Sequence, residues 1–432
     1  MNDLLPEETK FWSFIERKII SLFNSYGYEE IRTPILESTS LFQRGIGEVT
    51  DIVEKEMYSF TDRLNGHSYT LRPENTASVM RSNIEHHLTY NGPRKFWYFG
   101  PMFRHERPQQ GRYRQFYQFG IEAIGYKGFE IEAEQLFMIY KLWSLLGLSK
   151  SWEPKLYLNC LGTREERLNY KNALVDFFSL HKDLLDKDSL SRLERNPLRI
   201  LDSKNQKIRD LVSEAPEINK FMGKESKKNF SSLCNLLEDQ LIPYEFNSSL
   251  VRGLDYYNST VFEWATPFLG SQEAICGGGR YDHLVEMLGG KPIGACGFAI
   301  GMERLVSLLK KANVLRVEPS LDLYIVHVGY FAKIKALLFS ELLRASGISV
   351  KVDMTDASIK SQMKKAGLST ARFVAIFSKE DLDENNVVIR PILSPSSLGD
   401  KKIDFRIGEE KIKLDNLIKY LQSEFSQKEI SK

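Results

Sequence analysis

Residues 96–125 read FWYFGPMFRHERPQQGRYRQFYQFGIEAIG, and the fold can be worked out from this stretch. Its flanks, WYFGPMF and QFYQFGIEAIG, are rich in aromatic rings and run into glycine, which is typical of buried strands. Between them lies a polar loop with one acid, Glu106, and with four arginines, which are Arg104, Arg107, Arg112 and Arg114. The stretch therefore predicts a cleft that is floored by a sheet and lined at its mouth by guanidinium groups.

Such a cluster of guanidinium groups suits a polyanionic ligand. Guanidinium stays charged at any relevant pH and binds phosphate bidentately, so it can hold a nucleotide still while phosphorus chemistry occurs. The alternative is an ordinary hairpin with a solvated, charged tip. We favour the ligand site, because Glu106 alone does not balance four arginines.

Composition narrows the class of protein. A chain of 432 residues with 42% hydrophobic and 27% charged residues predicts a globular protein of two to three domains. Because its net charge is only +2, a nucleic acid would have to bind to a local basic patch on the surface. Four scattered cysteines predict a reduced protein without structural zinc. With neither a signal-peptide pattern nor a membrane-length apolar run, we expect a soluble cytoplasmic protein and no membrane partner.

Periodicity predicts the first elements of the chain. Residues 7–26 have helical spacing and end at Gly27. EEIRTPILE then predicts a strand broken by Pro34, which marks either a subunit contact or a simple sheet edge. HSYTLRPENTASVMRSNI predicts a strand that meets a helix whose first turn holds Glu74, Asn75 and Thr76.

Changes in composition predict the domain organisation. Residues 160–248 are rich in Lys, Glu, Leu and Ser with helical periodicity, whereas the aromatic and glycine-rich style returns with LVRGLDYYNSTVFEW at Leu250. From residue 319 the pattern becomes β-α-β-α-β. We therefore expect a catalytic domain in two parts, 1–159 and 249–318, interrupted by a helical insertion at 160–248 and followed by a small α/β domain at 319–432.

The motifs resemble those of a known family. IRTPILE, FRHERPQQGRYRQFYQFGIE and GFAIGMERL are similar to the three motifs of class II aminoacyl-tRNA synthetases. LVRGLDYYNSTVFEW and GGGRYD resemble the two segments peculiar to the histidyl-tRNA synthetases, and the resemblance covers essentially the whole chain. It implies an α+β catalytic domain, in which an antiparallel sheet has flanking helices, together with a helical insertion and a C-terminal α/β anticodon-binding domain. It also implies a homodimer with Pro34 near the interface.

The reaction implied by the resemblance joins L-histidine to ATP, giving histidyl-adenylate and pyrophosphate, and then transfers histidine to the 3′ end of histidine tRNA. Positioning and fixed positive charge dominate such a step. Arg104 matches the arginine on the α-phosphate, and Arg252 matches a second catalytic arginine that works where other class II enzymes place a metal. Arg112 and Arg304 match residues on the β,γ end of ATP, and Phe116 would stack on adenine. ATP is expected with Mg²⁺, and no metal site made of protein ligands alone.

Residues for histidine recognition follow from the same resemblance. Glu122 and Tyr257 match the partners of the imidazole, and a pocket of this kind rejects analogues that lack the ring nitrogens. The other matching positions surround the α-amino group or line the wall, and they are Glu74, Asn75, Thr76, Gln118, Arg252, Tyr256 and Tyr281. Simpler interpretations stay open. Glu74 could be an acid that stabilises a helix N-terminus, and the tyrosines could belong to the core packing. Arg252 could form a surface ion pair with Asp255, and Arg304 could lie on the surface of a helix.

Contacts with tRNA are predicted at two places. The loop from Pro108 to Arg114 matches the part that the family uses on the acceptor end, with Gln109 and Arg114 facing the extra 5′ guanosine of histidine tRNA. Farther on, three lysines either steer phosphate or form a solvated helix face, and they are Lys360, Lys364 and Lys365.

Some features depart from the family pattern. Asn75 stands where Gly is frequent, Tyr117 where His is common, and Gln110 where Lys is frequent. Family members usually carry several residues before MNDLLPEE, so we expect the assigned start to be late. The alternative function is a histidine-sensing regulatory paralogue of a biosynthetic ATP phosphoribosyltransferase. Such paralogues tend to lack an LVRGLDYY-type segment and the C-terminal domain, and this chain has both.

Overall fold

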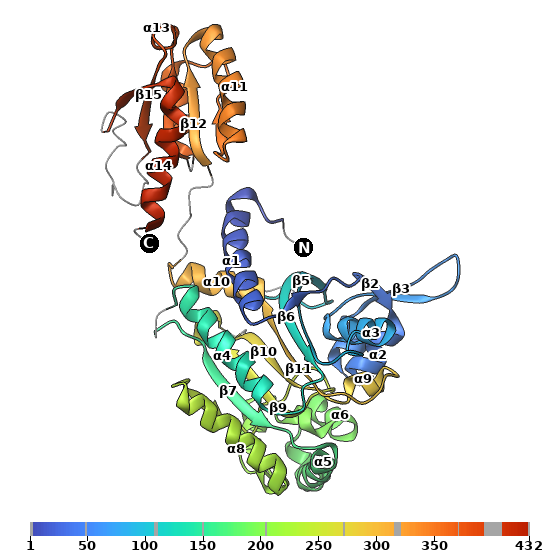
Figure 1. The fold of residues 1–432 in the computed structure, drawn as a ribbon. Helices are drawn as coiled ribbons and strands as arrows, with labels where there is room; N and C mark the ends of the chain where they lie inside the picture. Colours follow the sequence, from blue (N-terminus) through green and yellow to red (C-terminus); the bar gives the residue numbers. More distant parts are fainter. Residues whose placement is uncertain are drawn as a thin grey trace. The chain divides into compact units, whose positions relative to one another are not determined.

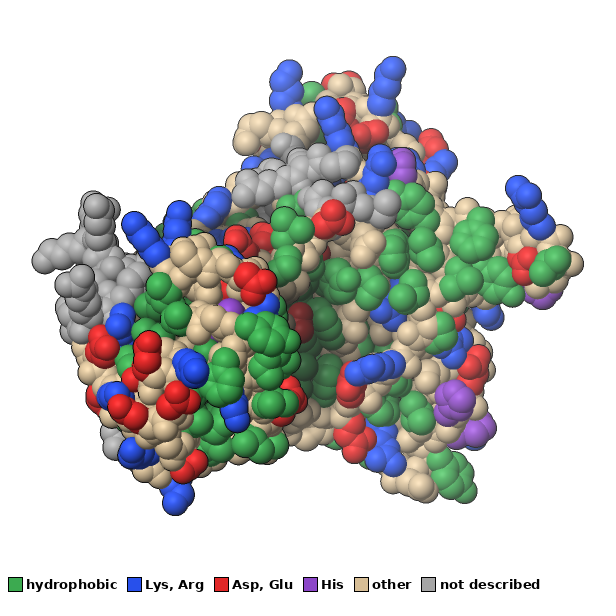
Figure 2. Space-filling view, turned by 90° about the horizontal axis from the view of Figure 1, so that it is seen from above, with side chains coloured by type: hydrophobic (Ala, Val, Ile, Leu, Met, Phe, Trp, Pro, Cys, Tyr) green, Lys and Arg blue, Asp and Glu red, His purple; other side chains and the backbone are tan. Residues whose placement is uncertain are grey.

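The computed structural model describes residues 3–47, 50–107, 111–148, 151–203, 205–270, 273–314, 321–369, 371–392 and 408–430. The chain forms two compact units, residues 1–315 and residues 316–432, which are treated separately below. Figure 1 shows the course of the chain. Basic and acidic side chains are interspersed on the face drawn in Figure 2, in keeping with a net charge of only +2. No helix in the described part of the chain is both long and apolar enough to cross a bilayer.

An eight-stranded sheet forms the centre of the first unit. Its strands, in spatial order, are β1 (Glu29–Glu30), β5 (Arg94–Phe103), β6 (Gln115–Ile124), β11 (Ala295–Gly301), β10 (Ala274–Arg280), β9 (Asn258–Ala265), β7 (Lys155–Cys160) and β8 (Tyr244–Phe246). The inner pairs are antiparallel, whereas β1 joins β5 and β8 joins β7 in parallel. The predicted antiparallel sheet is thus confirmed, with a parallel strand added at each edge.

One face of this sheet carries the main hydrophobic core. Helices α1 (Pro6–Ser25), α4 (Glu130–Leu145), α8 (Lys224–Asp239) and α10 (Met302–Lys311) supply its buried side chains, including Ile15, Trp143 and Leu305. Side chains alternate across a strand, so the odd positions Phe119 and Ile121 of β6 face this core. Each large side chain that is fully buried here contributes about 1.5–3 kcal/mol. This packing fixes which positions of β6 face the other side.

The opposite face is covered by shorter elements. Helices α3 (Thr76–His86) and α9 (Leu284–Met287) pack there around Met80, Tyr98 and Tyr281. Beside them, α2 (Thr39–Ile46), the single turn Ile52–Glu56 and a three-stranded sheet complete this side; the sheet order is β2 (Leu36–Ser38), β4 (Ser68–Leu71) and β3 (Tyr58–Thr61). The chain leaves regular strand pairing between β1 and β2, in a segment that contains Pro34, as the sequence predicts.

Helix α3 begins later than predicted. Its first residue is Thr76, and Asn75 occupies the N-cap position with Glu74 before it. The Glu74 carboxylate instead accepts hydrogen bonds from the backbone N–H groups of Thr76, at 2.7 Å, and Ala77, at 3.0 Å. Glu74 therefore does what the simpler interpretation expects of an acid at a helix N-terminus.

Between β7 and β9, which are neighbours in the sheet, the chain makes a helical excursion. Helices α5 (Arg164–Ser179), α6 (Lys187–Arg195) and α7 (Gln206–Val212) have a core of their own around Tyr170 and Phe178. In contrast, α8 packs on α4 and contributes Leu233 to the main core. The second half of the predicted insertion thus also builds the catalytic sheet and its core.

The second unit is a small α/β domain. Its sheet order is β13 (Val350–Val352), β12 (Leu321–His327), β14 (Ala371–Phe377), β15 (Asn386–Pro391) and β16 (Glu410–Lys413). The first three strands are parallel and the last two antiparallel. Its helices are α11 (Gly329–Ala345), α12 (Ile359–Leu368), α13 (Lys379–Asp383) and α14 (Leu417–Ile430). The predicted β-α-β-α-β order is present as β12, α11, β13, α12 and β14.

Candidate active site

A cavity of about 180 Å³ opens on the second face of the eight-stranded sheet. The even positions Phe116 and Gln118 of β6 line it, because the odd positions of that strand face the main core. On β11 the cavity side carries Gly297, Ala299 and Gly301, whose small size leaves room for a ligand. A Cβ on Gly297 would lie 2.2 Å from a carboxylate oxygen of Glu122. The glycine-rich strands therefore make the space that the site needs.

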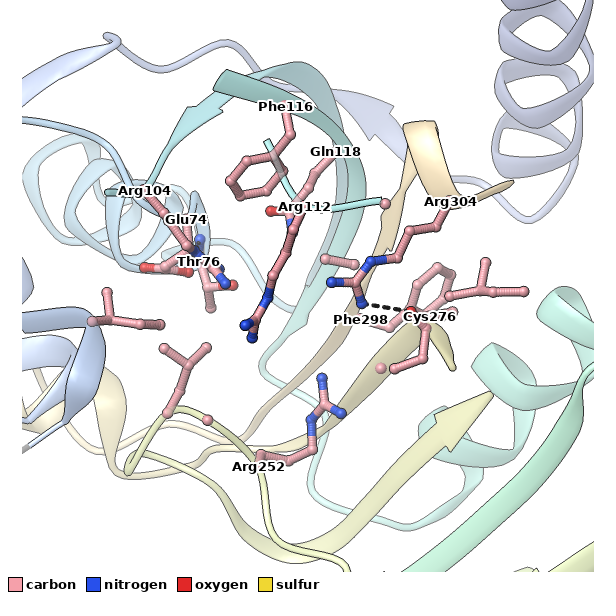
Figure 3. Close-up of a pocket in the computed structure, with 18 of the residues that line it drawn as sticks. Glu74, Thr76, Arg104, Arg112, Phe116, Gln118, Arg252, Cys276, Phe298 and Arg304 are labelled. Atoms are coloured by element: carbon pink, nitrogen blue, oxygen red, sulfur yellow. Dashed lines mark hydrogen bonds between the residues drawn. The ribbon is translucent and has the colours of Figure 1, made fainter. Parts of the chain in front are cut away.

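Four arginines reach this cavity from different elements. Arg104 follows β5, Arg112 precedes β6, Arg252 lies in the loop before β9, and Arg304 lies in the first turn of α10. Figure 3 shows Arg112, Arg252 and Arg304 converging on the same open space, with Arg104 farther along the wall. The predicted sheet-floored cleft lined by guanidinium groups is present, but of the four loop arginines only Arg104 and Arg112 line it. Arg107 and Arg114 are exposed outside the lining, and the other two arginines come from different segments.

Backbone and ring contacts hold two of these guanidinium groups in place. Arg104 Nε donates to the carbonyl of Pro73 at 2.9 Å, and its Cζ lies 5.2 Å from the centre of the Phe116 ring. Arg304 donates to the carbonyls of Gly111, at 3.0 Å, and Ala274, at 2.7 Å. Burial and the nearby Arg112 lower the pKa of Arg304. The two side chains are thus positioned before any ligand arrives.

The positive cluster is partly compensated, which corrects the prediction. Arg112 forms an ion pair with Glu106, the acid that was expected to leave the cluster unbalanced. Arg252 forms an ion pair with Glu263 on β9 rather than with Asp255. Burial lowers the pKa of Arg252 and the Glu263 charge raises it, with a raised pKa as the net result. Sequence proximity suggested Asp255, but the antiparallel sheet brings Glu263 closer.

Hydroxyl groups surround a buried carboxylate at the other end of the site. Thr76 Oγ1 donates to Glu122 Oε1 at 2.8 Å, and the Tyr98 hydroxyl donates to the same oxygen at 3.1 Å. The Tyr281 hydroxyl donates to Glu122 Oε2. Burial raises the pKa of Glu122 well above its usual value, and the Thr76 hydrogen bond opposes this. Tyr256 and Tyr257 pack against the Tyr281 ring at centroid distances of 5.4 and 5.9 Å.

The predicted residues fall into three groups in the structure. The first group lines the cavity and consists of Glu74, Thr76, Arg104, Arg112, Phe116, Gln118, Arg252, Tyr256, Tyr257 and Arg304. A second group is buried next to the lining: Glu122 and Tyr281 form the carboxylate network, and Asn75 accepts from Arg72 and Thr33. Arg114 is exposed, its Nε 3.4 Å from the carbonyl of Glu106, and Gln109 lies outside the described residues.

The lining residues that the sequence reasoning missed include Tyr98, Glu303 and Cys276. Tyr98 was overlooked, although it alternates with the core-facing residues of β5 and therefore had to face the site. Glu303 precedes Arg304, and both of its oxygens accept from the backbone N–H of Tyr117, at 2.9 and 3.2 Å. Cys276 lines the cavity from β10, where burial raises the pKa of its thiol. For Cys276 no local sequence signal pointed to the site.

The described side chains of the cavity do not by themselves form a metal site. Among the described residues there is no group of three His, Cys, Asp or Glu side chains placed to bind one ion. Mg²⁺ is usually bound by one or two carboxylates together with phosphates and water. A metal that entered here would therefore take most of its ligands from a phosphate-bearing substrate, with Glu106 and Glu303 as the acids that line the cavity beside the arginines.

Glu303 should make stability depend on pH. Burial raises its pKa to about 7, against the effect of the backbone N–H groups. Because the folded state holds this proton more tightly than the unfolded chain, stability falls as the pH rises from about 4.5 to about 7 and then levels off. Glu303→Gln should remove this component, so the unfolding free energy of the variant should fall less between pH 5 and pH 7.5. Urea unfolding of both proteins at pH 5 and pH 7.5 checks this. An equal fall in unfolding free energy in the variant and the wild type would contradict it.

The sheet, the converging arginines and the Phe116 ring in the cavity lining together define the catalytic domain of the class II aminoacyl-tRNA synthetases. A family model described as histidyl-tRNA synthetase matches residues 1–305, and one described as an anticodon binding domain matches residues 323–424. The chain belongs to the histidyl-tRNA synthetase family.

Relatives of known identity agree with this assignment. The histidine-tRNA ligases of Burkholderia orbicola and Burkholderia cenocepacia are each 48% identical over 416 residues, covering 95% of this chain and 93% of the relative. The crystal structure of apo histidyl-tRNA synthetase from Staphylococcus aureus matches with a TM-score of 0.79 and 36% identity, over 98% of each chain. A Bacillus halodurans structure titled ATP phosphoribosyltransferase regulatory subunit/histidyl-tRNA synthetase shares the fold, with a TM-score of 0.63 and 23% identity.

Proposed function

We propose that this chain is a histidine-tRNA ligase, which activates L-histidine with ATP and transfers it to the 3′ end of histidine tRNA. The observation that carries the proposal is the cavity itself, where four arginines face a sheet floor next to a buried carboxylate ringed by hydroxyl groups. The part of the cavity with the four arginines suits a nucleoside triphosphate. The part with the buried carboxylate and the hydroxyl groups suits a small polar side chain.

In the first step the arginines bind and orient ATP. Arg104 and Arg252 are proposed to hold the α-phosphate and to stabilise the negative charge that develops there. Hydrogen-bond donors that are already fixed in place stabilise such charge strongly where water is partly excluded. Arg112 and Arg304 would hold the β,γ end. Phe116 would stack on adenine, and its position in the cavity lining supports this role. Mg²⁺ bound to the phosphates would neutralise charge on them.

Histidine is proposed to bind beside Glu122. This carboxylate and Tyr257 would satisfy the two imidazole nitrogens, with Tyr256 and Tyr281 as the wall. Around the α-amino group we place Glu74, Thr76 and Gln118. Asn75 contacts Arg72 and Thr33 away from the cavity, so its proposed contribution to histidine binding is indirect. An apolar analogue of the same size would leave the buried polar groups unpaired and be rejected.

The regulatory paralogue is not favoured as an alternative. The chain carries the LVRGLDYY segment with its arginine and tyrosines at the cavity, and it has the second α/β unit. Pyrophosphate exchange screened with each amino acid separates the two functions. A ligase gives exchange with histidine alone, whereas a sensor binds histidine and gives no exchange.

Gln109 and Arg114 are proposed to act on tRNA and not on ATP. Arg114 is exposed and outside the cavity lining, which supports a role apart from the first step. Contacts to base edges commonly discriminate by about 1–3 kcal/mol. Gln109→Ala combined with Arg114→Ala should therefore leave pyrophosphate exchange near normal, slow aminoacylation and reduce the preference for tRNA with the extra 5′ guanosine. The test compares tRNA with and without that nucleotide, and a collapse of exchange would place both residues on ATP instead.

A cytoplasmic homodimer completes the proposal. Ile35 and Leu36 are each 42% exposed beside Pro34, and Phe60 on the same small sheet is 49% exposed. Apolar groups exposed on one small sheet suit a two-fold contact in which the same patch serves both subunits. We predict a dimer by light scattering at micromolar concentration, and we expect Leu36→Asp to shift it towards monomer. A fully active monomeric wild-type protein would contradict this.

A further inference from the structure

The loop at residues 250–257 carries three of the proposed site residues but has no regular structure of its own. It connects β8 to β9 and brings Arg252, Tyr256 and Tyr257 to the cavity. Its conformation must therefore be set by contacts from other elements. Three of its backbone carbonyls accept hydrogen bonds from side chains of the helical excursion, namely those of Gly253, Asp255 and Tyr257.

Arg167 supplies two of these hydrogen bonds. It lies in the first turn of α5, directly after the sheet strand β7, and its side chain is only 18% exposed. Its Nη1 donates to the carbonyls of Asp255, at 3.1 Å, and Tyr257, at 2.9 Å, and its Nη2 lies 3.5 Å from Asp255 Oδ1. The Arg167 guanidinium thus holds the backbone of the loop at two points, residues 255 and 257.

Asn196 and Arg199 complete the set from the segment after α6. Asn196 is buried, and its Nδ2 donates to both carboxylate oxygens of Asp255, at 2.7 and 2.9 Å. Arg199 Nη2 donates to the carbonyl of Gly253 at 2.6 Å, next to Arg252 in the chain. We call Arg167, Asn196 and Arg199 the loop clamp.

Elements around the cavity also contact this loop and the helices that hold it. The backbone N–H of Asp255 donates to the carbonyl of Ile46 at the end of α2, at 3.1 Å. Arg195 of α6 pairs with Glu54 at 2.6 Å, in a turn that also carries Ile52 to the cavity. Asp255 of the cavity loop thus contacts both the helical excursion and α2. Because Asn196 occupies both of its carboxylate oxygens, Asp255 is not available to Arg252.

We propose that the loop clamp positions the catalytic loop for adenylate formation. Arg167, Asn196 and Arg199 do not line the cavity, so they act through the backbone that carries Arg252, Tyr256 and Tyr257. Misplacing a catalytic group by about 1 Å can cost about 100-fold in rate. The inference rests on the proposed function, and it makes the inserted helices part of the apparatus for the first step.

The sharpest test uses Arg199, because it makes a single hydrogen bond to the loop. In histidine-dependent pyrophosphate exchange, Arg199→Ala should lower kcat by about 10-fold to 100-fold, with a smaller effect on the KM for ATP. Arg199→Lys can still supply one N–H donor and should recover most of the rate. Arg209→Ala is the matched control, since Arg209 is exposed on α7 of the same helical segment.

Asn196→Asp provides a second test, because it places a carboxylate against the Asp255 carboxylate. It should reduce kcat more than Arg199→Ala does, and the loss should be smaller at low pH, where one of the two carboxylates is protonated. Thermal unfolding accompanies every variant. A loss of activity that only follows the loss of melting temperature, or that appears equally in Arg209→Ala, would overturn the positioning role.

The controls keep the two proposals apart. If the wild-type protein gives no histidine-dependent exchange, the proposed function fails and the loop clamp falls with it. If the wild type is active and Arg199→Ala keeps its kcat within about twofold, the loop clamp alone is wrong. Should Asn196→Asp fail to fold, the comparison of Arg199→Ala with Arg199→Lys still decides.

Discussion

Replacing Arg252 with Lys should slow histidyl-adenylate formation by about 100-fold to 1,000-fold, corresponding to a loss of about 2.7–4 kcal/mol of transition-state stabilisation. Lysine keeps the positive charge but loses the planar fork that can serve two oxygens at once. The surroundings of Arg252 are built for that fork. It pairs with Glu263. A Cβ on Gly277 would lie 2.1 Å from its Nη2, so the glycine at this position leaves the room that the guanidinium occupies.

Pre-steady-state measurement of adenylate formation checks this prediction directly. Histidine affinity, measured separately by equilibrium binding, should change by no more than about threefold, because the contact forms mainly in the transition state. Arg209→Lys on the exposed face of α7 is the matched control for the substitution. An adenylate rate within about twofold of wild type would remove Arg252 from the catalytic residues.

Glu122→Gln should raise the KM for histidine by about 10-fold to 100-fold and leave the KM for ATP nearly unchanged. The Glu122 carboxylate accepts from three hydroxyl groups, which belong to Thr76, Tyr98 and Tyr281. An amide keeps one acceptor oxygen and turns an NH₂ group towards the other donors. Leaving a buried donor unsatisfied costs about 1–3 kcal/mol, and tenfold in affinity corresponds to about 1.4 kcal/mol.

Steady-state pyrophosphate exchange with each substrate varied in turn measures both effects. Glu245→Gln is the matched control, because Glu245 is exposed at the sheet edge, where it pairs with Lys155. If Glu122→Gln raised both KM values equally, its effect would be a general loss of structure. An unchanged KM for histidine would show that the substrate does not depend on this carboxylate.

Much of the site could be predicted because its residues lie on regular elements. Strand β6 places Phe116 and Gln118 on the cavity side, and its alternation with Phe119 follows from the sequence pattern. GMER at the start of a helix likewise brought Arg304 to the cavity. Residues outside such regularity were harder to place. Arg114 follows the polar loop and lies in the open, where no periodicity indicates its direction.

Ion pairs and shared hydrogen bonds were the main source of error. The alternative interpretation paired Arg252 with Asp255, three residues away in the chain, but the ion pair forms with Glu263 on β9. Arg112 pairs with Glu106, which was expected to leave the cluster unbalanced. Tyr98 was assigned only to a strand, although its hydroxyl reaches Glu122. These partners depend on the register between strands and on loop paths, which local sequence does not specify.

The amino-acid sequence by itself determined the layers of this protein: an antiparallel sheet, the helices on it, the helical segment between two of its strands and the separate α/β unit. It did so because hydrophobic periodicity and glycine positions act within a few residues. Only the tertiary structure decided the pairing of charges in the cavity and the attachment of the loop at residues 250–257 to Arg167, Asn196 and Arg199. The loop contacts join residues about 55 to 90 positions apart, and a hydrogen bond between such groups exists only once packing has brought both ends together.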